Sequence, residues 1–285
     1  MSLPPLGGEP NVEDPWAVLV PVPYERTTTY RKGTAQGPAA LLEASTQVEL
    51  YDEEVQLEPL HRGVATTEPL TCDAMPDVLA DELESITKPH YAAGRLVGVL
   101  GGEHSVSLGS IRACAQEHGP IGILQIDAHP DLRDSYEGTR YGHGCVMRRA
   151  LDLASVTSLV GVGLRAVSGE DHAVIESDAR VHPIYAYEFR QGGWIERAIA
   201  ALPEEVYVTF DVDGLDPSIV PGTGTPEPGG LGWWEALALL RAVFTQRRVV
   251  GFDVVELLPE PPSCVSDFAA ARLVFKMLAY AEATR

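Results

Sequence analysis

The sequence predicts an α/β protein with a single doubly wound domain, in which a mainly parallel eight-stranded sheet carries helices on both faces. Short β-branched runs alternate with amphipathic helical patterns over most of the 285 residues. Several of these runs are almost continuously apolar, as expected for parallel strands that are buried on both faces. No internal repeat or low-complexity segment marks a second domain. We therefore expect one domain over residues 1–285, with residues 1–15 poorly ordered.

Eight segments have the length and the apolar or β-branched composition of strands. The Gly/Pro-rich stretch Pro217–Gly232 follows the seventh of them, and we expect it to be a structured active-site loop rather than a linker. In chain order the predicted strands are Ala17–Val22, Gly63–Thr66, Leu96–Leu100, Ile121–Ile126, Ser158–Val162, Val181–Ile184, Val206–Phe210 and Val249–Val254.

Helices are predicted where apolar residues recur at helical spacing between these strands. The pair Gly37-Pro38 precedes the first helix, and proline is common in the first turn of a helix. In chain order the predicted helices are Ala39–Val48, Asp77–Tyr91, Ser107–Glu117, Trp194–Ala201, Trp233–Phe244 and Asp267–Ala283.

Composition limits the kinds of partner. The formal net charge is −20, which disfavours nucleic acid and anionic membranes and attracts small cations, although an ordinary acidic surface has the same signature. The four cysteines have no CxxC spacing, so we expect reduced thiols and a cytoplasmic location. The start of the chain has no basic and apolar signal segment, and no apolar stretch reaches the roughly 18 residues of a membrane helix.

Possible metal ligands stand directly after the predicted strand Ile121–Ile126, in the segment Asp127-Ala128-His129-Pro130-Asp131. Alternation in an extended chain puts Asp127, His129 and Asp131 on the same side. Carboxylates held so close repel each other, and a cation is the usual compensation. The alternative is a solvated turn with ordinary capping aspartates.

Two further segments carry similar residues after predicted strands. Asp211 and Asp213 alternate in Phe210-Asp211-Val212-Asp213, and His104 follows Gly101-Gly102-Glu103. A single histidine in that position is more often structural than a ligand. Because ligands of open α/β sheets bind at the carboxyl ends of the strands, the three segments together predict a metal site.

Four carboxylates and two imidazoles form a hard, oxygen-rich set, which fits Mn²⁺ better than a thiolate-seeking metal. Six ligands exceed what one ion with an open position needs. Two ions about 3.5–4 Å apart, bridged by carboxylates and a water, use them fully. We therefore expect two Mn²⁺ per chain.

Five motifs together resemble the ureohydrolase superfamily, which includes arginase and agmatinase. The segment YRKGTAQGPAALLEAS at 30–45 is similar to the N-terminal segment of the agmatinase branch. The motifs are GGEHS at 101–105, DAHPD at 127–131, FDVDGLDP at 210–217, GTGTPEPGG at 222–230 and FDVVEL at 252–257.

The resemblance implies an arginase-like fold and a role for each matched residue. His143 falls where the family has a proton-shuttling histidine, and Glu256 where it has the carboxylate that holds the substrate guanidinium. One ion would be bound by His104, Asp127, Asp131 and Asp211, and the other by Asp127, His129, Asp211 and Asp213, so that Asp127 and Asp211 bridge the pair.

Two positions differ from the arginase branch. Arg133 stands where arginases have an asparagine that binds the substrate α-carboxylate, and Ser168 where they have an aspartate that helps to hold the α-amino group. The resemblance therefore implies agmatine as the substrate, hydrolysed to putrescine and urea, in polyamine biosynthesis. It also implies a homo-oligomer, either a trimer or a hexamer.

The guanidinium carbon is a poor electrophile, so hydrolysis needs a hydroxide near neutral pH. Two metal ions supply it by lowering the pKa of a bridging water from ~15.7 to ~7. Asp131 is expected to orient this metal-bridging hydroxide and to pass on its proton, and His143 to relay protons to solvent. Glu256 is the expected bidentate partner of the small cationic guanidino substrate.

Three alternatives remain open at this point. Related ureohydrolases act on aminopropylagmatine, guanidinobutyrate or arginine, and Arg133 offers a cation for guanidinobutyrate. A deacetylase of acetylated amines shares the fold, but with one zinc. A binding or regulatory homologue would have lost metal ligands, whereas all six are present here.

Overall fold

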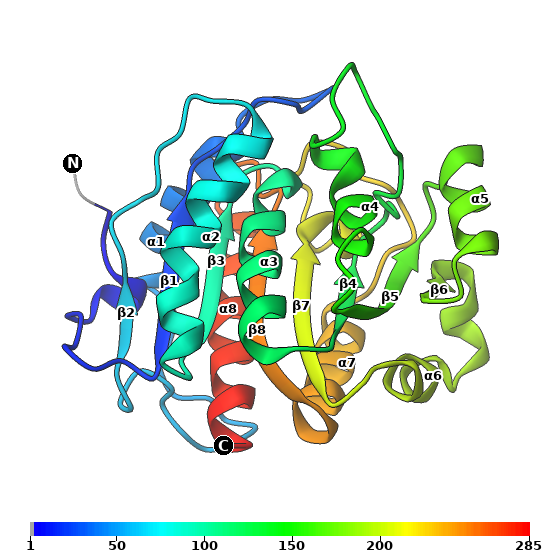
Figure 1. Cartoon of the computed structure of the whole chain (residues 1–285). Helices are drawn as coiled ribbons and strands as arrows, with labels where there is room; N and C mark the ends of the chain where they lie inside the picture. The colour runs from blue at the N-terminus through cyan, green and yellow to red at the C-terminus, as the bar shows by residue number, and fades with distance from the viewer. Residues whose placement is uncertain (1–2) are drawn as a thin grey trace.

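The computed structural model describes residues 3–285 and contains one sheet of eight parallel strands. The strand order across the sheet is β2-β1-β3-β8-β7-β4-β5-β6, so β2 and β6 are the edges (Figure 1). This is the α/β sheet that the sequence predicts. The strands are β1 (Ala17–Val22), β2 (Val64–Thr66), β3 (Leu96–Gly101), β4 (Ile121–Ile126), β5 (Val156–Leu164), β6 (Val181–Tyr185), β7 (Glu205–Asp211) and β8 (Arg248–Val255).

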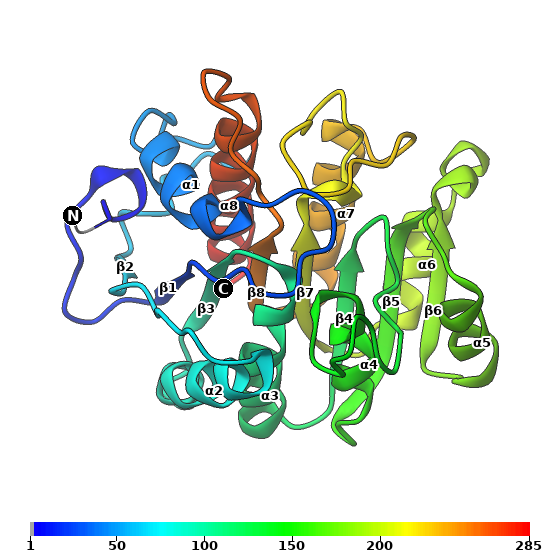
Figure 2. The same cartoon turned by 90° about the horizontal axis from the view of Figure 1, so that it is seen from above.

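Helices cover both faces of the sheet, as Figure 2 shows from above. The core accordingly forms two apolar clusters, because alternate residues of each strand face opposite sides. In β3, for example, Leu96 packs in one cluster and Val97 in the other. One face carries α1 (Gly37–Ser45), α6 (Trp194–Ala201), α7 (Trp233–Gln246) and α8 (Val265–Ala283), and the other carries α2 (Pro76–Ala92), α3 (Ser107–His118), α4 (Val146–Leu151) and α5 (Gly169–Ser177).

The parallel arrangement brings the carboxyl ends of all strands to one edge of the sheet. The central strands β3, β8, β7 and β4 are direct neighbours there, although at least 36 residues of the chain separate the two strands of each neighbouring pair. This adjacency positions the site, because each of these four strands is followed by predicted site residues.

The structure departs from the sequence expectation at three helices and in the N-terminal segment. Helix α1 begins at Gly37 and ends at Ser45, earlier than predicted, and the helices α4 and α5 were not expected at all. The first 15 residues were expected to be poorly ordered, but Leu6 is buried and its backbone N–H donates to Thr66 Oγ1 at 3.1 Å. Residues 1 and 2 lie outside the described part of the chain. Within residues 3–285 no helix is long and apolar enough to cross a membrane.

Candidate metal centre and active site

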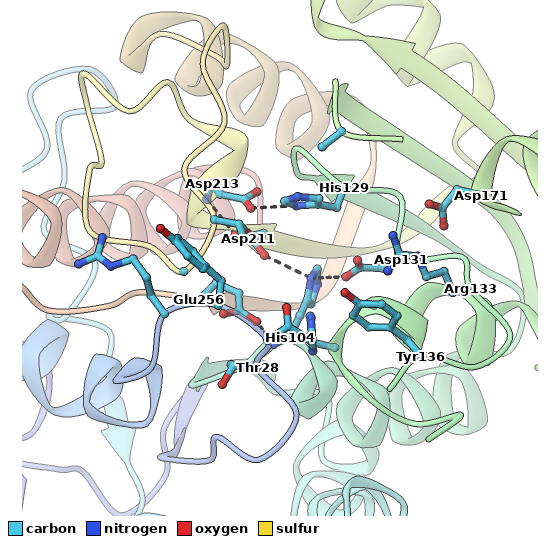
Figure 3. A pocket seen from close by; sticks show the side chains of 18 residues that line it. Thr28, His104, His129, Asp131, Arg133, Tyr136, Asp171, Asp211, Asp213 and Glu256 are labelled. Atoms are coloured by element: carbon cyan, nitrogen blue, oxygen red, sulfur yellow. Dashed lines mark hydrogen bonds and ion pairs between the residues drawn. The ribbon is translucent and has the colours of Figure 1, made fainter. Parts of the chain in front are cut away.

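A cavity of about 160 Å³ opens at the carboxyl edge of the sheet, over β3, β8, β7 and β4. Figure 3 shows labelled side chains from these strand ends converging on it. Asp127 is completely buried beneath the cavity. The other seven predicted site residues line it, namely His104, His129, Asp131, His143, Asp211, Asp213 and Glu256.

One group of potential ligands surrounds the His104 ring. Its Nδ1 lies 3.2 Å from Asp127 Oδ2, 3.0 Å from Asp131 Oδ2 and 3.5 Å from Asp211 Oδ2. The imidazole is 1% exposed, so these oxygens meet Nδ1 away from solvent.

The other ring nitrogen of His104 fixes the tautomer. His104 Nε2 lies 2.8 Å from Thr209 Oγ1, and the Thr209 hydroxyl donates to Asp253 Oδ1 at 2.7 Å. Because the Thr209 hydroxyl donates its only proton to Asp253, it can only accept from His104. His104 Nε2 must therefore be protonated and donate to Thr209 Oγ1. Nδ1 then presents a lone pair to three carboxylates and has no hydrogen-bond partner within the described chain. Such a concentration of buried acceptors fits a cation between them.

The second group surrounds His129. Its Nδ1 lies 3.0 Å from Asp213 Oδ2 and 3.5 Å from Asp127 Oδ1. Asp127 thus belongs to both groups, with Oδ2 toward His104 and Oδ1 toward His129. Among residues 3–285, His104–Asp127–Asp131 and Asp127–His129–Asp213 are the two sets of side chains that could each hold a metal ion.

The ionisation of these groups reflects the crowding of negative charge. Burial raises the pKa of Asp211 well above its ordinary value, and the neighbouring Asp213 adds to the effect. Burial and Asp127 likewise raise the pKa of Asp131. Burial opposes protonation of His129, but Asp213 and Asp127 raise its pKa to about 12. The negative charge of the carboxylate cluster is therefore not neutralised by the protein alone, and divalent cations would neutralise it.

Two site residues have left-handed backbone conformations that non-glycine residues rarely adopt. Asp131 has φ 53° and Glu256 has φ 63°. Outliers of this kind concentrate at functional sites, where the surrounding structure holds them. Here the backbone N–H of Glu256 donates to Gly102 at 2.8 Å, and Glu256 Oε1 accepts from the backbone N–H of His104 at 2.7 Å. Burial raises the pKa of Glu256 well above its ordinary value.

The cavity also contains residues that the sequence did not assign to the site. Tyr30 and Arg31 come from the N-terminal segment, and Arg31 pairs with Glu260 at 2.5 Å. The guanidinium of Arg133 lies over the ring of Tyr136, with Arg133 Cζ 4.1 Å from the centre of the ring. Only the family resemblance of residues 30–45 indicated that this N-terminal segment belongs near the site. No local sequence pattern predicts that a loop folds over the end of a strand that is distant in the chain.

Asp171 is a further residue that lines the cavity without having been predicted. It forms a capping box with Ser168 at the start of α5, and its Oδ1 accepts from the backbone N–H of Leu132 at 3.1 Å. The Ser168 hydroxyl is therefore engaged at the helix start. The Ser-x-x-Asp spacing of a capping box was present in the sequence and would have indicated this helix.

Comparison with known proteins gives consistent matches over nearly the whole chain. A model of the arginase family matches residues 16–279. The N(1)-aminopropylagmatine ureohydrolase of Synechocystis sp. is 41% identical over 276 residues, covering 94% of this chain and 89% of that protein. The agmatinase of Pyrococcus horikoshii is 30% identical, covering 94% and 93%. The crystal structure of the agmatine ureohydrolase of Thermoplasma volcanium is similar with a TM-score of 0.87 at 29% identity, covering 99% and 96%.

Proposed function

This chain belongs to the arginase family of C–N bond hydrolases, and we propose that it releases urea from a guanidinoalkylamine at a pair of bound Mn²⁺ ions. The observation that carries the proposal is the pair of His/Asp groups that share Asp127, with Glu256 in the same cavity. As all eight strands belong to one sheet, we propose that residues 1–285 act as one catalytic domain.

The metal centre is proposed on the chemistry of its donors. Two imidazoles and four carboxylates suit a hard divalent ion such as Mn²⁺. Two ions bound there would lower the pKa of a water so that a nucleophile forms near neutral pH. One ion would be held by His104, Asp127, Asp131 and Asp211, and the other by Asp127, His129, Asp211 and Asp213.

Glu256 is the proposed partner of the substrate guanidinium. It is 8% exposed, it lines the cavity, and no arginine or lysine side chain pairs with it within residues 3–285. A planar cation that donates two parallel hydrogen bonds to the carboxylate compensates such a buried charge. The backbone N–H of His104 fixes Oε1 and so sets the direction in which the carboxylate faces.

Proton transfer is assigned to Asp131 and His143. Asp131 would hydrogen-bond the attacking water, take its proton, and hand that proton to the nitrogen of the departing amine. The amine leaves only after protonation, and urea is the second product. His143, at the same cavity, would exchange protons with solvent.

Two substrates are favoured for the remaining part of the molecule. Agmatine, which would give putrescine, follows from the likeness to agmatinases. N1-aminopropylagmatine is the second candidate, because the relative that is 41% identical is named for it. Arginine is disfavoured because Arg133 lines the cavity and the Ser168 hydroxyl is engaged with Asp171. Arg133 also keeps guanidinobutyrate, an acid, among the substrates to be compared.

The test is urea release from agmatine, N1-aminopropylagmatine, guanidinobutyrate and arginine by protein loaded with Mn²⁺, with the chelated protein as the control. We expect the two amines to give kcat/KM values at least about tenfold above those of guanidinobutyrate and arginine, a preference of about 1.4 kcal/mol. No urea from any of the four would refute the proposal. Metal analysis should give two manganese ions per chain, whereas one zinc would favour an amine deacetylase. We further propose a trimer or a hexamer, which light scattering measures.

A further inference from the structure

Glu103 is a completely buried carboxylate that is not among the residues lining the cavity. It precedes His104 in the chain, yet its side chain faces the N-terminal loop. Each carboxylate oxygen accepts two hydrogen bonds. Oε2 accepts from the backbone N–H groups of Arg26 at 2.6 Å and Thr27 at 2.5 Å, and Oε1 accepts from the hydroxyls of Thr27 at 2.7 Å and Ser105 at 2.5 Å.

Thr27 joins this carboxylate to His143. Its Oγ1 lies 3.2 Å from His143 Nδ1 and accepts from the backbone N–H of His143 at 3.0 Å. The hydroxyl therefore stands between Glu103, which follows β3, and the loop that carries His143. The backbone at Gly142 also approaches Thr27 closely, since a Cβ there would lie 3.1 Å from Thr27 Oγ1.

The direction of each hydrogen bond follows from counting protons. Four donors, among them the Thr27 hydroxyl, occupy the four lone-pair positions of the Glu103 carboxylate, so its oxygens act as acceptors. The single hydroxyl proton of Thr27 is thus committed to Glu103. Its oxygen is then an acceptor toward His143, so the nitrogen that faces it, Nδ1, must carry the proton.

We infer that Glu103 and Thr27 are positioning residues that hold His143 as the Nδ1–H tautomer and leave Nε2 as the nitrogen that exchanges protons. In other catalytic histidines, a carboxylate that is hydrogen-bonded directly to the imidazole fixes its tautomer and orientation. Here the Glu103 carboxylate has the same effect through the Thr27 hydroxyl. The effect on turnover rests on the proposed function, in which His143 moves protons. The tautomer itself does not rest on it.

The alternative is a purely mechanical role, in which the same hydrogen bonds only tether the N-terminal loop to the site. A tether would tolerate either tautomer of His143. The two roles therefore differ in the position of one proton, and the substitution Glu103→Gln separates them. The backbone N–H groups of Arg26 and Thr27 cannot reverse, so the new amide oxygen must face them at the Oε2 position. The new NH₂ then takes the Oε1 position and donates to Thr27, whose hydroxyl turns to His143 Nδ1.

The experiment measures the ¹⁵N ring shifts of His143 in the full-length protein labelled with ¹⁵N-histidine, both metal-free and loaded with diamagnetic Zn²⁺. The His143→Asn variant identifies the signals. We expect the Nδ1–H tautomer in the unmodified protein and in Thr27→Ser, the Nε2–H tautomer in Glu103→Gln, and a mixture in Thr27→Val. An Nε2–H tautomer in the unmodified protein, or an unchanged Nδ1–H tautomer in Glu103→Gln, would overturn the inference.

Turnover provides the second measurement. Thr27→Val should lower kcat by about tenfold to a hundredfold, with KM changed less than about twofold, because the general acid–base step is impaired while binding is not. Thr27→Ser should restore kcat. The exposed Thr245→Val on α7 is the matched control and should leave kcat unchanged. If no guanidino compound yields urea, the proposed function fails while the tautomer measurement still decides this inference.

Discussion

Asp131 combines a strained backbone with the chemistry assigned to it. Its φ of 53° lies in the left-handed region, which asparagine tolerates at least as well as aspartate. The substitution Asp131→Asn therefore removes the charge and the proton-accepting oxygen without a new backbone cost. This makes it a cleaner probe of catalysis than alanine would be.

We predict that Asp131→Asn retains most of its manganese, because the remaining ligands are unchanged, and loses about a thousandfold or more in kcat. Metal analysis after gel filtration and steady-state urea release measure the two quantities. Asp81→Asn, at an exposed position of α2, is the matched control and should behave as the unmodified protein. Near-normal turnover of Asp131→Asn would show that another group handles the proton.

Glu256 provides a second test at the residue scale. Glu256→Gln keeps an oxygen for the backbone N–H of His104 but removes the negative charge that is proposed to face the substrate guanidinium. Loss of one partner of a buried charged pair costs about 3 kcal/mol, so kcat/KM should fall by roughly a hundredfold. The loss should be similar for agmatine and for N1-aminopropylagmatine, because both share the guanidinium. A loss confined to one of them would mean that Glu256 contacts the other end of the substrate.

At the scale of the elements, the pairing of β7 with β8 holds in place the residues that orient His104, a proposed metal ligand. Thr209 on β7 is the register partner of Asp253 on β8, and this pairing permits the 2.7 Å hydrogen bond between their side chains. Tyr207, also on β7, donates to the other Asp253 oxygen at 2.9 Å. The two strands thereby fix the acceptor that orients His104.

We predict that Thr209→Val lowers manganese affinity by about tenfold to a hundredfold, because His104 Nε2–H loses its acceptor and the ring loses its fixed orientation. Thr209→Ser keeps the hydroxyl and should bind nearly as the unmodified protein does. Calorimetric titration of the metal-free protein with Mn²⁺ measures both. Equal affinity of the valine and serine variants would contradict a role for this hydrogen bond.

The elements also explain which parts could be foreseen from the sequence. β1 and β4 were predicted to the residue, because each is an apolar run that a turn ends sharply. Helix α5 was missed because only Asp171 and Ile175 of its nine residues are buried, so it lacks an apolar stripe. The contact of Thr27 with His143 joins residues 116 positions apart. Such a contact depends on how a loop folds over a sheet edge, and no local pattern encodes it.

The whole molecule gathers buried negative charge at one edge of its sheet. The folded-state pKa values of Asp211, Asp131 and Glu256 are raised above those of an unfolded chain, with burial as the leading cause. Such groups favour the folded state at a pH below their unfolded pKa, near 4, and this contribution is lost as the pH rises toward the folded pKa. The metal-free protein should therefore become less stable as the pH rises, whereas bound cations offset the repulsion.

We predict that the melting temperature of the metal-free protein falls between pH 5.5 and pH 8, and that Mn²⁺ raises it most at pH 8. At about a thousand times its dissociation constant, a ligand stabilises the folded state by about 4 kcal/mol, which corresponds to roughly 10 °C for a chain of this size. Thermal unfolding with chelator or with excess Mn²⁺ measures this difference at each pH. Asp127→Ala lacks the residue shared by both ligand groups, so Mn²⁺ should raise its melting temperature far less. A metal-free protein that is as stable at pH 8 as at pH 5.5 would mean that these carboxylates do not repel one another in the folded state. The electrostatic argument for two bound cations would then fail.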